Sequence, residues 1–575
     1  MSRSRSYCRV VISLLALAAF AVRAASLDAQ SLWRDEVDAL HFAAAPWPEM
    51  LSNFTRPGWN GPFYFLLLRG WVTLTGTSEY AMRFFSLAFG VLCVPLVYAL
   101  GRRLFNRQTG TLAALLVTTS PYLTWYSQEV KMYTLVPALV LLAIYGLRRA
   151  IEGEGWRWWA VQVAATSLAF YSHILAALLI PVQVLLCLAW WPQTRKQWAG
   201  VLVSLACLTL PYLPLADWQA RLVLQERETG FARHSLGNMV QILLDGWSMG
   251  VFGASSWSGH WSRSLVGVLV EWGRSVIGWC WPWGAVRAVR MDALAAWVLD
   301  ILNKGWSLDT MLMSILAMWG LASPLLVPHK EKRREGRLAL VCWLMTPLLA
   351  VWLISLRQPL FTDRYLIWAA PAFYLLIALG LASLLRFGGW WRWAVVLLVG
   401  IILLSNIVNQ LQQATTPMKS DFRAAAAYIA GYHTSDEPSV SRPPLQVTDE
   451  EYAFKCYLPL ATTGRRPFDG LIIFQIPHGR YTFNYYFPEE EYPWAEGLYT
   501  NHRAPDGSYL MSEQEAAYRM REMTARYDVV WLVATEMPMW DERGLVQAWL
   551  ESNALRVDEA HFARVDVYRY LTRKT

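Results

Sequence analysis

A run of charged residues follows directly after the first apolar stretch of the chain. The segment Trp33-Arg34-Asp35-Glu36-Val37-Asp38 contains three carboxylates. An uncompensated carboxylate beside hydrocarbon is costly, so such groups must be hydrated, paired or used. A carboxylate in a partly water-excluded cavity is suited to act as a general base or to bind a metal ion. We therefore expect chemistry at this segment, with capping of a juxtamembrane helix by Asp35 and Glu36 as the alternative.

Three further polar clusters interrupt apolar sequence. They are Tyr126-Ser127-Gln128-Glu129-Val130-Lys131-Met132-Tyr133, Ser172-His173 and Asp363-Arg364-Tyr365. Lys131 and Arg364 carry charges that can hold a phosphate, and an arginine can do so with two parallel hydrogen bonds. Each cluster alone also has an ordinary structural reading: Glu129 and Lys131 as anchors at the headgroup level, His173 as a turn residue, and Asp363 with Arg364 as a local ion pair.

The composition indicates a polytopic membrane protein. Of 575 residues, 55% are hydrophobic and 16% are charged, and the mean hydropathy is +0.26. This is too apolar for an ordinary soluble protein, and the length suffices for about ten spans of roughly 20 residues. The net charge of +8 comes from basic residues in short loops between apolar segments, which indicates membrane topology instead of nucleic-acid binding. The seven cysteines are scattered without metal-ligand spacing.

The charge pattern predicts the side of the membrane on which each cluster lies. Basic residues before the apolar run 10–22 put the N-terminus in the cytoplasm, although the same layout also describes a cleaved signal peptide. Basic loops at 101–107, 148–149, 195–196 and 329–337 are expected inside. Counting from these loops gives about eleven spans in the plasma membrane. Asp35 and the other three clusters then face the extracytoplasmic side.

The same pattern divides the chain into a transmembrane domain, residues 1–411, and an extracytoplasmic α/β domain, residues 412–575. Within the first, residues 28–80 form an outer loop with a helix at 63–74 along the interface. Residues 215–308 form a long outer region, whose apolar part 264–283 is either interfacial or an extra pair of spans. In the second, we expect helices at 422–432, 513–526 and 542–552 and strands at 471–475, 528–534 and 564–570.

In combination, these motifs resemble bacterial glycosyltransferases of the GT-C fold, which are relatives of the protein O-mannosyltransferases and of the lipid A aminoarabinose transferase. The resemblance rests on the Tyr126–Tyr133 cluster and on these further segments: Trp33-Arg34-Asp35-Glu36, Gly61-Pro62-Phe63-Tyr64, Ser78-Glu79-Tyr80-Ala81-Met82-Arg83, Gly101-Arg102-Arg103-Leu104-Phe105, Tyr171-Ser172-His173, Asp363-Arg364-Tyr365 and Asp421-Phe422-Arg423-Ala424. It covers the first two hundred residues well. The chain departs from the pattern at Asn60-Gly61-Pro62, where many relatives have His-Pro-Pro, and at Lys131, where relatives often have arginine.

The resemblance implies transfer of a sugar from a polyprenyl-phosphate donor to an acceptor, which is a protein, lipid or glycan, on the outer face with inversion. It implies Asp35 as base and Glu36 and Glu129 as orienting or metal-coordinating groups. It implies donor or phosphate contacts for Arg34, Tyr126, Lys131, His173, Arg364 and Tyr365. A divalent metal, Mg²⁺ or Mn²⁺, is compatible with this reading, with Asp35 and Glu129 as its candidate ligands.

Two other functions use similar groups. A transporter or flippase for a lipid-linked sugar also needs charged residues, but these are expected near the membrane midplane, often in broken helices. Here the charged residues lie at span ends, which favours an enzyme. A polysaccharide polymerase or ligase shares the outer-face chemistry and differs mainly in its acceptor.

Overall fold

The computed structural model describes residues 2–54, 61–213, 231–251, 307–323, 331–433, 470–487, 492–504 and 506–572. The chain forms two compact units, and each combines segments that are distant in sequence. The membrane unit contains Met1–Ser26, Ala45–Leu74 and Arg83–Gln413, whereas the C-terminal unit contains Leu27–Ala44, Thr75–Met82 and Ala414–Thr575. The segment that carries Asp35 thus belongs to the same unit as the C-terminal α/β domain.

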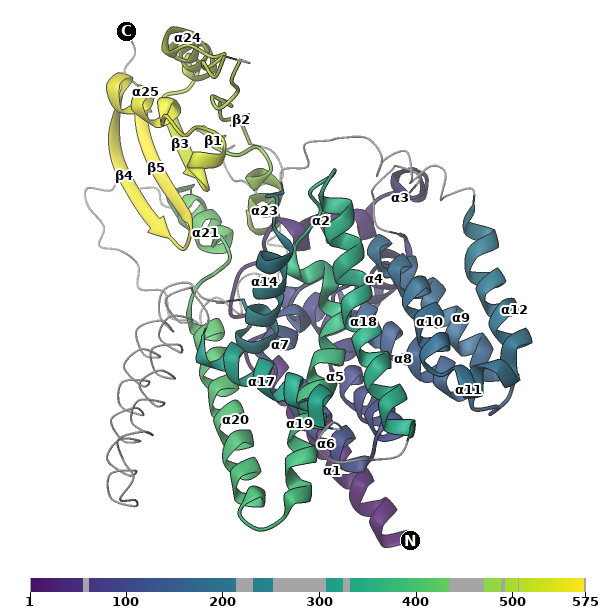
Figure 1. Ribbon diagram of the computed structural model, residues 1–575. Helices are drawn as coiled ribbons and strands as arrows, with labels where there is room; N and C mark the ends of the chain where they lie inside the picture. The colour runs from purple at the N-terminus through teal and green to yellow at the C-terminus, as the bar shows by residue number, and fades with distance from the viewer. Residues whose placement is uncertain are drawn as a thin grey trace, which may run out of the picture. The chain divides into compact units, whose positions relative to one another are not determined.

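All the regular elements in the described part of the membrane unit are helices (Figure 1). Its α-helices are α1 (Ser2–Ala24), α3 (Trp47–Phe54), α4 (Phe63–Thr75), α5 (Glu79–Leu104), α6 (Arg107–Thr119), α7 (Pro121–Ser127), α8 (Leu135–Ile151), α9 (Trp156–Phe170), α10 (Leu179–Ala189), α11 (Trp191–Thr194), α12 (Trp198–Thr209), α14 (Leu236–Met249), α17 (Leu308–Ala322), α18 (Glu331–Ser355), α19 (Ala370–Leu384) and α20 (Trp391–Thr415). The first residues of α5 and the last of α20 belong to the C-terminal unit.

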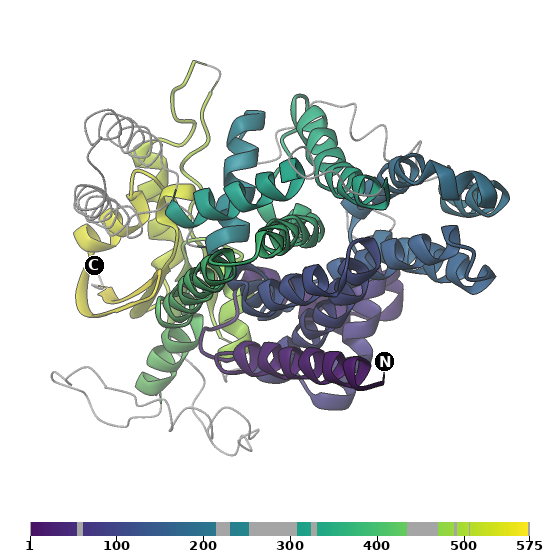
Figure 2. The same cartoon turned by 60° about the horizontal axis from the view of Figure 1, so that its bottom comes forward.

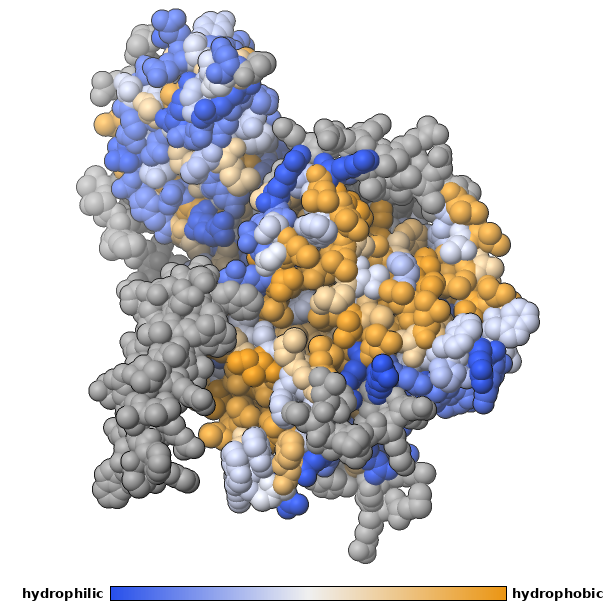
Figure 3. All heavy atoms as spheres, viewed as in Figure 1, coloured by the Kyte–Doolittle hydropathy of each residue, from blue (hydrophilic) through white to orange (hydrophobic). Residues whose placement is uncertain are grey.

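Four of the described helical stretches are long and apolar enough to cross a membrane: Glu79–Leu104, Arg334–Ser355, Asp363–Phe387 and Trp391–Thr415. The pair Ile174–Ala189 and Trp191–Tyr212, bent by 89°, adds a fifth if it is one broken span. In the space-filling view, hydrophobic residues gather over the membrane unit, and the unit that carries the sheet is mainly hydrophilic (Figure 3). The protein is therefore a membrane protein, and the total of about eleven spans stays a prediction.

The centre of the membrane unit is α19, every residue of which is buried. It packs against α6, α17 and α18. Two glycines allow the backbones of α17 and α19 to approach each other. A Cβ at Gly380 would lie 2.2 Å from the carbonyl oxygen of Leu316, and one at Gly320 would lie 2.3 Å from that of Leu376. Small residues at such a crossing are typical of helix packing in membranes.

The N-terminal helix α1, which is the purple helix at the N mark in Figure 2, packs against α6. The guanidinium of Arg23 is fully buried and donates to the carbonyl oxygens of Val117 (2.9 Å) and Thr118 (3.0 Å). These carbonyls lie in the last turn of α6, where backbone acceptors lack helical partners. The first apolar segment is thus an integral part of the membrane unit.

The C-terminal unit contains a five-stranded sheet with the order β2-β1-β3-β5-β4. The strands are β1 (Leu471–Phe474), β2 (Trp494–Glu496), β3 (Val529–Ala534), β4 (Ala554–Phe562) and β5 (Val565–Thr572), and the helices are α2 (Arg34–Ala44), α21 (Phe422–His433), α23 (Gly479–Tyr486), α24 (Glu513–Thr524) and α25 (Leu545–Asn553). Strand β1 is parallel to β2 and β3, whereas β5 is antiparallel to β3 and β4.

Both faces of the sheet are covered, as expected for strands that are buried on both sides. Ile472 and Phe474 of β1 pack with Phe422 of α21 and Phe483 of α23. On the opposite face, Leu471 and Ile473 belong to a core that also contains Met520 of α24 and Leu550 of α25. The alternation along β1 assigns its four residues to the two faces in turn.

Most of the expected elements are confirmed, with shifted ends. The helices expected at 422–432, 513–526 and 542–552 and the strands at 471–475, 528–534 and 564–570 correspond to α21, α24, α25, β1, β3 and β5. Two expectations were wrong in detail. The basic stretch 329–337 was expected to be a loop, but α18 begins within it, at Glu331. No element was expected at residues 554–562, which form β4. The helices expected at 264–283 lie outside the described residues.

Candidate functional site

The membrane unit brings together two of the predicted clusters through a tyrosine and a carboxylate. Tyr126 is the sixth residue of α7, and its hydroxyl donates to Oδ2 of Asp363 at 3.0 Å. Tyr122, one turn earlier on the same helix, donates to the carbonyl oxygen of Asp363 at 3.0 Å. The Asp363 carboxylate also accepts from the hydroxyl of Thr362 at 3.2 Å. Burial, followed by the negative charge of Asp363, raises the pKa of Tyr126 well above its ordinary value, so Tyr126 is a proton donor at neutral pH.

The residues after Asp363 contact the same cluster. The guanidinium of Arg364 lies 5.7 Å from the ring centre of Tyr133, and the ring of Tyr133 packs edge-on against Tyr126 at 5.3 Å. The rings of Tyr365 and His173 are 5.0 Å apart. Three of the four sequence clusters therefore meet inside one unit.

His173 is kept neutral by its surroundings. Its side chain is 4% exposed, and Nδ1 accepts a hydrogen bond from the backbone N–H of Leu175 at 3.3 Å. Burial and then the positive charge of Arg364 lower the pKa of His173 to about 4. A neutral imidazole beside a guanidinium can accept or donate a hydrogen bond to a ligand without adding a positive charge.

Glu129 and Lys131 follow in the turn between α7 and α8. Glu129 is fully buried, whereas Lys131 is half-buried. The backbone N–H of Lys131 donates to the carbonyl oxygen of Glu129 at 2.8 Å, and its carbonyl oxygen accepts from the hydroxyl of Ser86 at 3.2 Å. A buried glutamate and a half-buried lysine therefore lie on one tight turn.

Two other residues of this motif hold the turn in place. Ser127 is fully buried, and its hydroxyl accepts from Nε of Arg23 at 3.1 Å. The side-chain amide of Gln128 donates to the carbonyl oxygen of Arg23 at 2.9 Å and to the hydroxyl of Ser26 at 3.0 Å. The C-terminal end of α1 is therefore fixed to the motif, which gives Ser127 and Gln128 structural roles.

The Gly61-Pro62 motif meets the turn that carries His173. The backbone N–H of Phe63 donates to the carbonyl oxygen of Tyr171 at 3.0 Å. A Cβ at Gly61 would lie only 2.3 Å from the same oxygen, so a larger residue cannot occupy this position without a shift of the backbone. The close contact explains a glycine at this place in the motif.

The acidic segment that contains Asp35 lies in the C-terminal unit, at the first turn of α2. Helix α2 has Asp35 and Glu36 in its first turn, where the negative charges of acidic side chains interact favourably with the positive end of the helix dipole. Asp35 is half-buried. Arg34 and Asp38 form an ion pair at 3.5 Å, with side chains that are 56% and 33% exposed. The capping expected for this segment is confirmed for Glu36, whose Oε2 accepts from the backbone N–H of Trp33 at 3.3 Å.

A set of long-range bonds holds this segment to the rest of the C-terminal unit. The ammonium of Lys419 donates to Oε2 of Glu36 at 2.8 Å. Arg423 forms an ion pair with Glu79, and Tyr486 donates to the same carboxylate. The motif residues Glu79 and Arg423 are thus partners, although 344 positions separate them.

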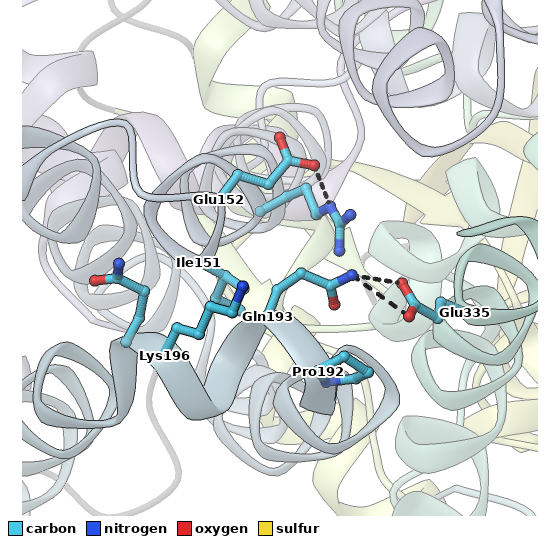
Figure 4. Close-up of a pocket in the computed structure, with 8 residues that line it drawn as sticks. Ile151, Glu152, Pro192, Gln193, Lys196 and Glu335 are labelled. Carbon is cyan, nitrogen blue, oxygen red and sulfur yellow. Dashed lines mark hydrogen bonds and ion pairs between the residues drawn. The ribbon is translucent and has the colours of Figure 1, made fainter. Parts of the chain in front are cut away.

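The described residues also contain a pocket of about 490 Å³ that holds none of the predicted site residues (Figure 4). Its lining comes from the ends of α8, α11 and α18 and includes Arg148, Gln193 and Glu335. Arg148 pairs with Glu152 at 2.9 Å, and Gln193 donates to Glu335 at 3.3 Å. These residues belong to the basic loops predicted to be cytoplasmic, so the pocket is expected on the opposite side from the site.

Among the described residues, no group of three or more His, Cys, Asp or Glu side chains is placed to hold a metal ion. The candidate ligands Asp35 and Glu129 belong to different units. The metal site therefore stays a prediction, as does the convergence of the Asp35 segment with the Tyr126–Tyr133 cluster.

Sequence reasoning did not single out Tyr122, Tyr133 or the acceptor role of Asp363. A signal for the first was the spacing of Tyr122 and Tyr126, which places both rings on one face of a helix. Lys419 carried no signal in the sequence, because nothing near it indicates a buried partner.

Comparisons with known proteins bear on the family and the fold of the chain. Residues 57–213 match the profile of the family described as dolichyl-phosphate-mannose-protein mannosyltransferase. This segment contains the Tyr126–Tyr133 cluster and His173. Over these residues the chain is similar to the protein mannosyltransferases of this family.

Solved structures of the oligosaccharyltransferase of Archaeoglobus fulgidus, a GT-C glycosyltransferase, share the fold of this chain at low sequence identity. The oligosaccharyltransferase of Archaeoglobus fulgidus, in a complex with Zn and sulfate, has a TM-score of 0.53 and 13% sequence identity. The match covers 98% of this chain and 73% of the oligosaccharyltransferase chain. The same enzyme with an inhibitory peptide and a dolichol-phosphate has a TM-score of 0.52 and 13% identity, over 98% and 74%. ArnT from Cupriavidus metallidurans, bound to undecaprenyl phosphate, has a TM-score of 0.49 and 13% identity, over 97% of both chains. No curated protein matches the sequence significantly.

Proposed function

We propose that this protein is a glycosyltransferase that transfers a sugar from a polyprenyl-phosphate donor to an acceptor on the extracytoplasmic face of the plasma membrane, with inversion at the anomeric carbon. The observation that carries the proposal is the family match over residues 57–213, which names a lipid-phosphate sugar as donor. The complex of the archaeal oligosaccharyltransferase with dolichol-phosphate is consistent with such a donor. The described residues also supply the cations that a phosphate leaving group requires.

The donor phosphate is held by Lys131 and Arg364. Both are half-buried in the membrane unit, where a cation interacts with a phosphate more strongly than in open water. Arg364 stacks over Tyr133, and the neighbouring Asp363 is fixed by Tyr126, so the guanidinium is oriented before the donor binds. Neutral His173, together with Tyr126 and Tyr365, contributes hydrogen bonds to the donor. Arg34, which is the most exposed of these cations, is a further candidate contact for the phosphate.

The chemical step is a single displacement. The acceptor oxygen attacks the anomeric carbon, the bond from that carbon to the phosphate oxygen breaks, and polyprenyl phosphate leaves with the electron pair. The acceptor proton passes to the carboxylate of Asp35. One displacement inverts the anomeric configuration. Glu129 orients the reacting groups, and a divalent metal ion bound by Asp35 and Glu129 would stabilise the negative charge of the leaving phosphate.

The proposal is tested with the purified full-length protein in nanodiscs and a panel of polyprenyl-phosphate sugars, with release of polyprenyl phosphate as the readout. General-base catalysis contributes about 10²- to 10⁴-fold to a rate, so Asp35→Asn is expected to lower kcat by at least ~100-fold. Asp38→Asn, three residues away on the same helix, is the matched control and is expected to retain activity. Normal turnover of a folded Asp35→Asn variant would remove Asp35 from the base role. Absence of turnover by the wild type with every donor would refute the donor class.

Two further measurements refine the proposal. The anomeric configuration of the product is determined by nuclear magnetic resonance, and retention would exclude a single displacement. Dialysis against a chelator, followed by addition of Mg²⁺ or Mn²⁺, tests the metal. Unchanged activity after complete metal removal would leave Asp35 and Glu129 without a metal role.

A further inference from the structure

A buried ion pair in the C-terminal unit joins the helix that carries Asp35 to the segment before α21. Nζ of Lys419 lies 2.8 Å from Oε2 of Glu36, and the two side chains are 4% and 0% exposed. The same carboxylate oxygen accepts from the backbone N–H of Trp33. The ammonium also lies 5.5 Å from the ring centre of Trp33. Glu36 thus ties the start of α2 and Lys419 together in one buried cluster.

Hydrogen bonds along both segments extend this connection. The backbone N–H groups of Met418 and Lys419 donate to Oε1 of Gln30 at 3.0 and 3.1 Å. The amide of Gln30 donates in turn to the carbonyl oxygen of Thr416 at 3.2 Å, and the hydroxyl of Ser31 donates to the carbonyl oxygen of Ser420 at 2.7 Å. Residues 30–36 and 416–420 are therefore held side by side by main-chain and side-chain bonds.

The neighbouring helix completes the support of α2. Helix α2 packs against α23. The hydroxyl of Tyr486, the last residue of α23, accepts from the backbone N–H of Leu32 at 2.6 Å. The residues that lead into the first turn of α2 are thus held by two parts of the C-terminal unit, namely α23 and the segment before α21.

Glu36 and Asp35 are adjacent but face different directions. Successive residues of an α-helix point about 100° apart, and here Glu36 is fully buried against Lys419 whereas Asp35 is half-buried. Burial of an ion pair seldom adds net stability compared with an apolar pair of similar volume, but it can fix one specific arrangement. The arrangement fixed here is the rotation of the first turn of α2, which decides where the Asp35 carboxylate points.

We infer that Lys419 is a positioning residue for Asp35, and that Glu36 serves as its partner and does not contact the substrate or a metal ion. The inference rests on the proposed role of Asp35 as base. It makes the segment before α21, which lies far from the first loop in sequence, part of the apparatus that orients the catalytic carboxylate.

The test is a double-mutant cycle of Glu36→Gln and Lys419→Met in the full-length protein in nanodiscs. Each single variant leaves one buried group without its charged partner, and a displacement of about 1 Å at a catalytic group can cost about 100-fold in rate. We expect kcat to fall by about 100-fold in each single variant, with KM for the donor nearly unchanged. The double variant, which removes both charges, is expected to recover to within about tenfold of the wild type. Lys419→Arg keeps the charge and is expected to retain more activity than Lys419→Met.

The outcomes separate positioning from direct chemistry. A double variant that remains as inactive as Glu36→Gln would show that Glu36 acts on the substrate or on a metal ion, and a fully active Lys419→Met variant would show that the pair does not position Asp35. Arg519→Met is the matched control, because Arg519 pairs with Glu515 at 2.6 Å on an exposed face of α24. This variant is expected to behave as the wild type does.

A second readout does not depend on the proposed function. Hydrogen–deuterium exchange of peptides that cover α2 is expected to be faster in Lys419→Met than in the wild type and to return toward the wild-type rate in the double variant. If the wild type transfers no sugar but this pattern is found, the donor assignment fails and the positioning of α2 stands. Unchanged exchange in both single variants would overturn the inference. If Lys419→Met does not fold, Lys419→Arg takes its place in both readouts, and wild-type rate and exchange in Lys419→Arg together with the expected recovery in the double variant would support the inference.

Discussion

The hydrogen bond between Tyr126 and Asp363 leads to a prediction that separates binding from stability. Tyr126→Phe removes a donor that lies 3.0 Å from Oδ2 of Asp363, and the tyrosine is 4% exposed. A hydrogen bond to a charged group contributes about 1.5–3 kcal/mol. Asp363 keeps the hydroxyl of Thr362 as a second donor, so we expect a loss at the lower end of this range, about 1.5–2 kcal/mol.

The same change should weaken donor binding. Without this bond, the backbone that carries Arg364 keeps the hydrogen bond from Tyr122 to the carbonyl oxygen of Asp363 but loses the one through the Asp363 side chain, so it is held less firmly. We therefore expect KM for the polyprenyl-phosphate donor to rise about tenfold, equivalent to about 1.4 kcal/mol, with kcat altered less than KM. Steady-state kinetics in nanodiscs give the two constants, and thermal unfolding gives the stability.

A double-mutant cycle that combines Tyr126→Phe with Asp363→Asn tests whether the two residues act through each other, and a control variant tests whether the effect on KM is specific. Coupling between the two sites should be about 1 kcal/mol or more, well above the error of roughly 0.3–0.5 kcal/mol for independent sites. Tyr570→Phe is the control, because Tyr570 also donates to a carboxylate, that of Glu551, at 2.9 Å but lies in β5. It should lower stability and leave KM unchanged. Additive effects of Tyr126→Phe and Asp363→Asn, or a wild-type KM in both, would refute the reasoning.

Two other predictions concern proton binding and topology. Burial and the charge of Arg364 lower the pKa of His173 from 6.5 to about 4. As the pH falls, the unfolded chain therefore binds the proton before the folded protein does. The free energy of unfolding should decrease by about 3 kcal/mol between about pH 6.5 and about pH 4. Thermal unfolding of the wild type and His173→Gln across this range checks the sign, and equal slopes would contradict it. Single cysteines at exposed Gln108 and Tyr518, in a background without other exposed thiols, are expected to react with an impermeant maleimide from opposite sides of the membrane. Labelling of both from one side would show that the predicted topology is wrong.

The fold class and most elements of the C-terminal unit could be predicted because their sequence patterns are strong. Strands β1 and β3 are short apolar runs and β5 alternates, so their type follows from periodicity. Strand β4 was missed because it lies at the edge of the sheet and pairs only with β5. Its sequence contains Arg556, Asp558 and Glu559, and most of its side chains are exposed or half-exposed, which gives no apolar signal.

The site was predictable to the extent that its residues form local motifs. Tyr126, Glu129 and Lys131 stand together in the sequence, so a polar turn between apolar helices was evident. Their partners were not, since Asp363 lies 237 positions from Tyr126. The burial of Glu36 could not be predicted either, because its carboxylate pairs with Lys419, which only the folded C-terminal unit brings near.

The partnership between Glu36 and Lys419 also has a consequence for biosynthesis. The two residues are 383 positions apart, and a ribosome adds about 5–20 residues per second. Roughly 20 to 80 seconds therefore pass between the synthesis of Glu36 and that of its partner. During that interval the start of α2 lacks the lysine that orients it, so an incomplete chain in the membrane would be unable to consume lipid-linked sugar. Under the proposed function, catalytic competence would then arise late, only after the C-terminal unit has folded.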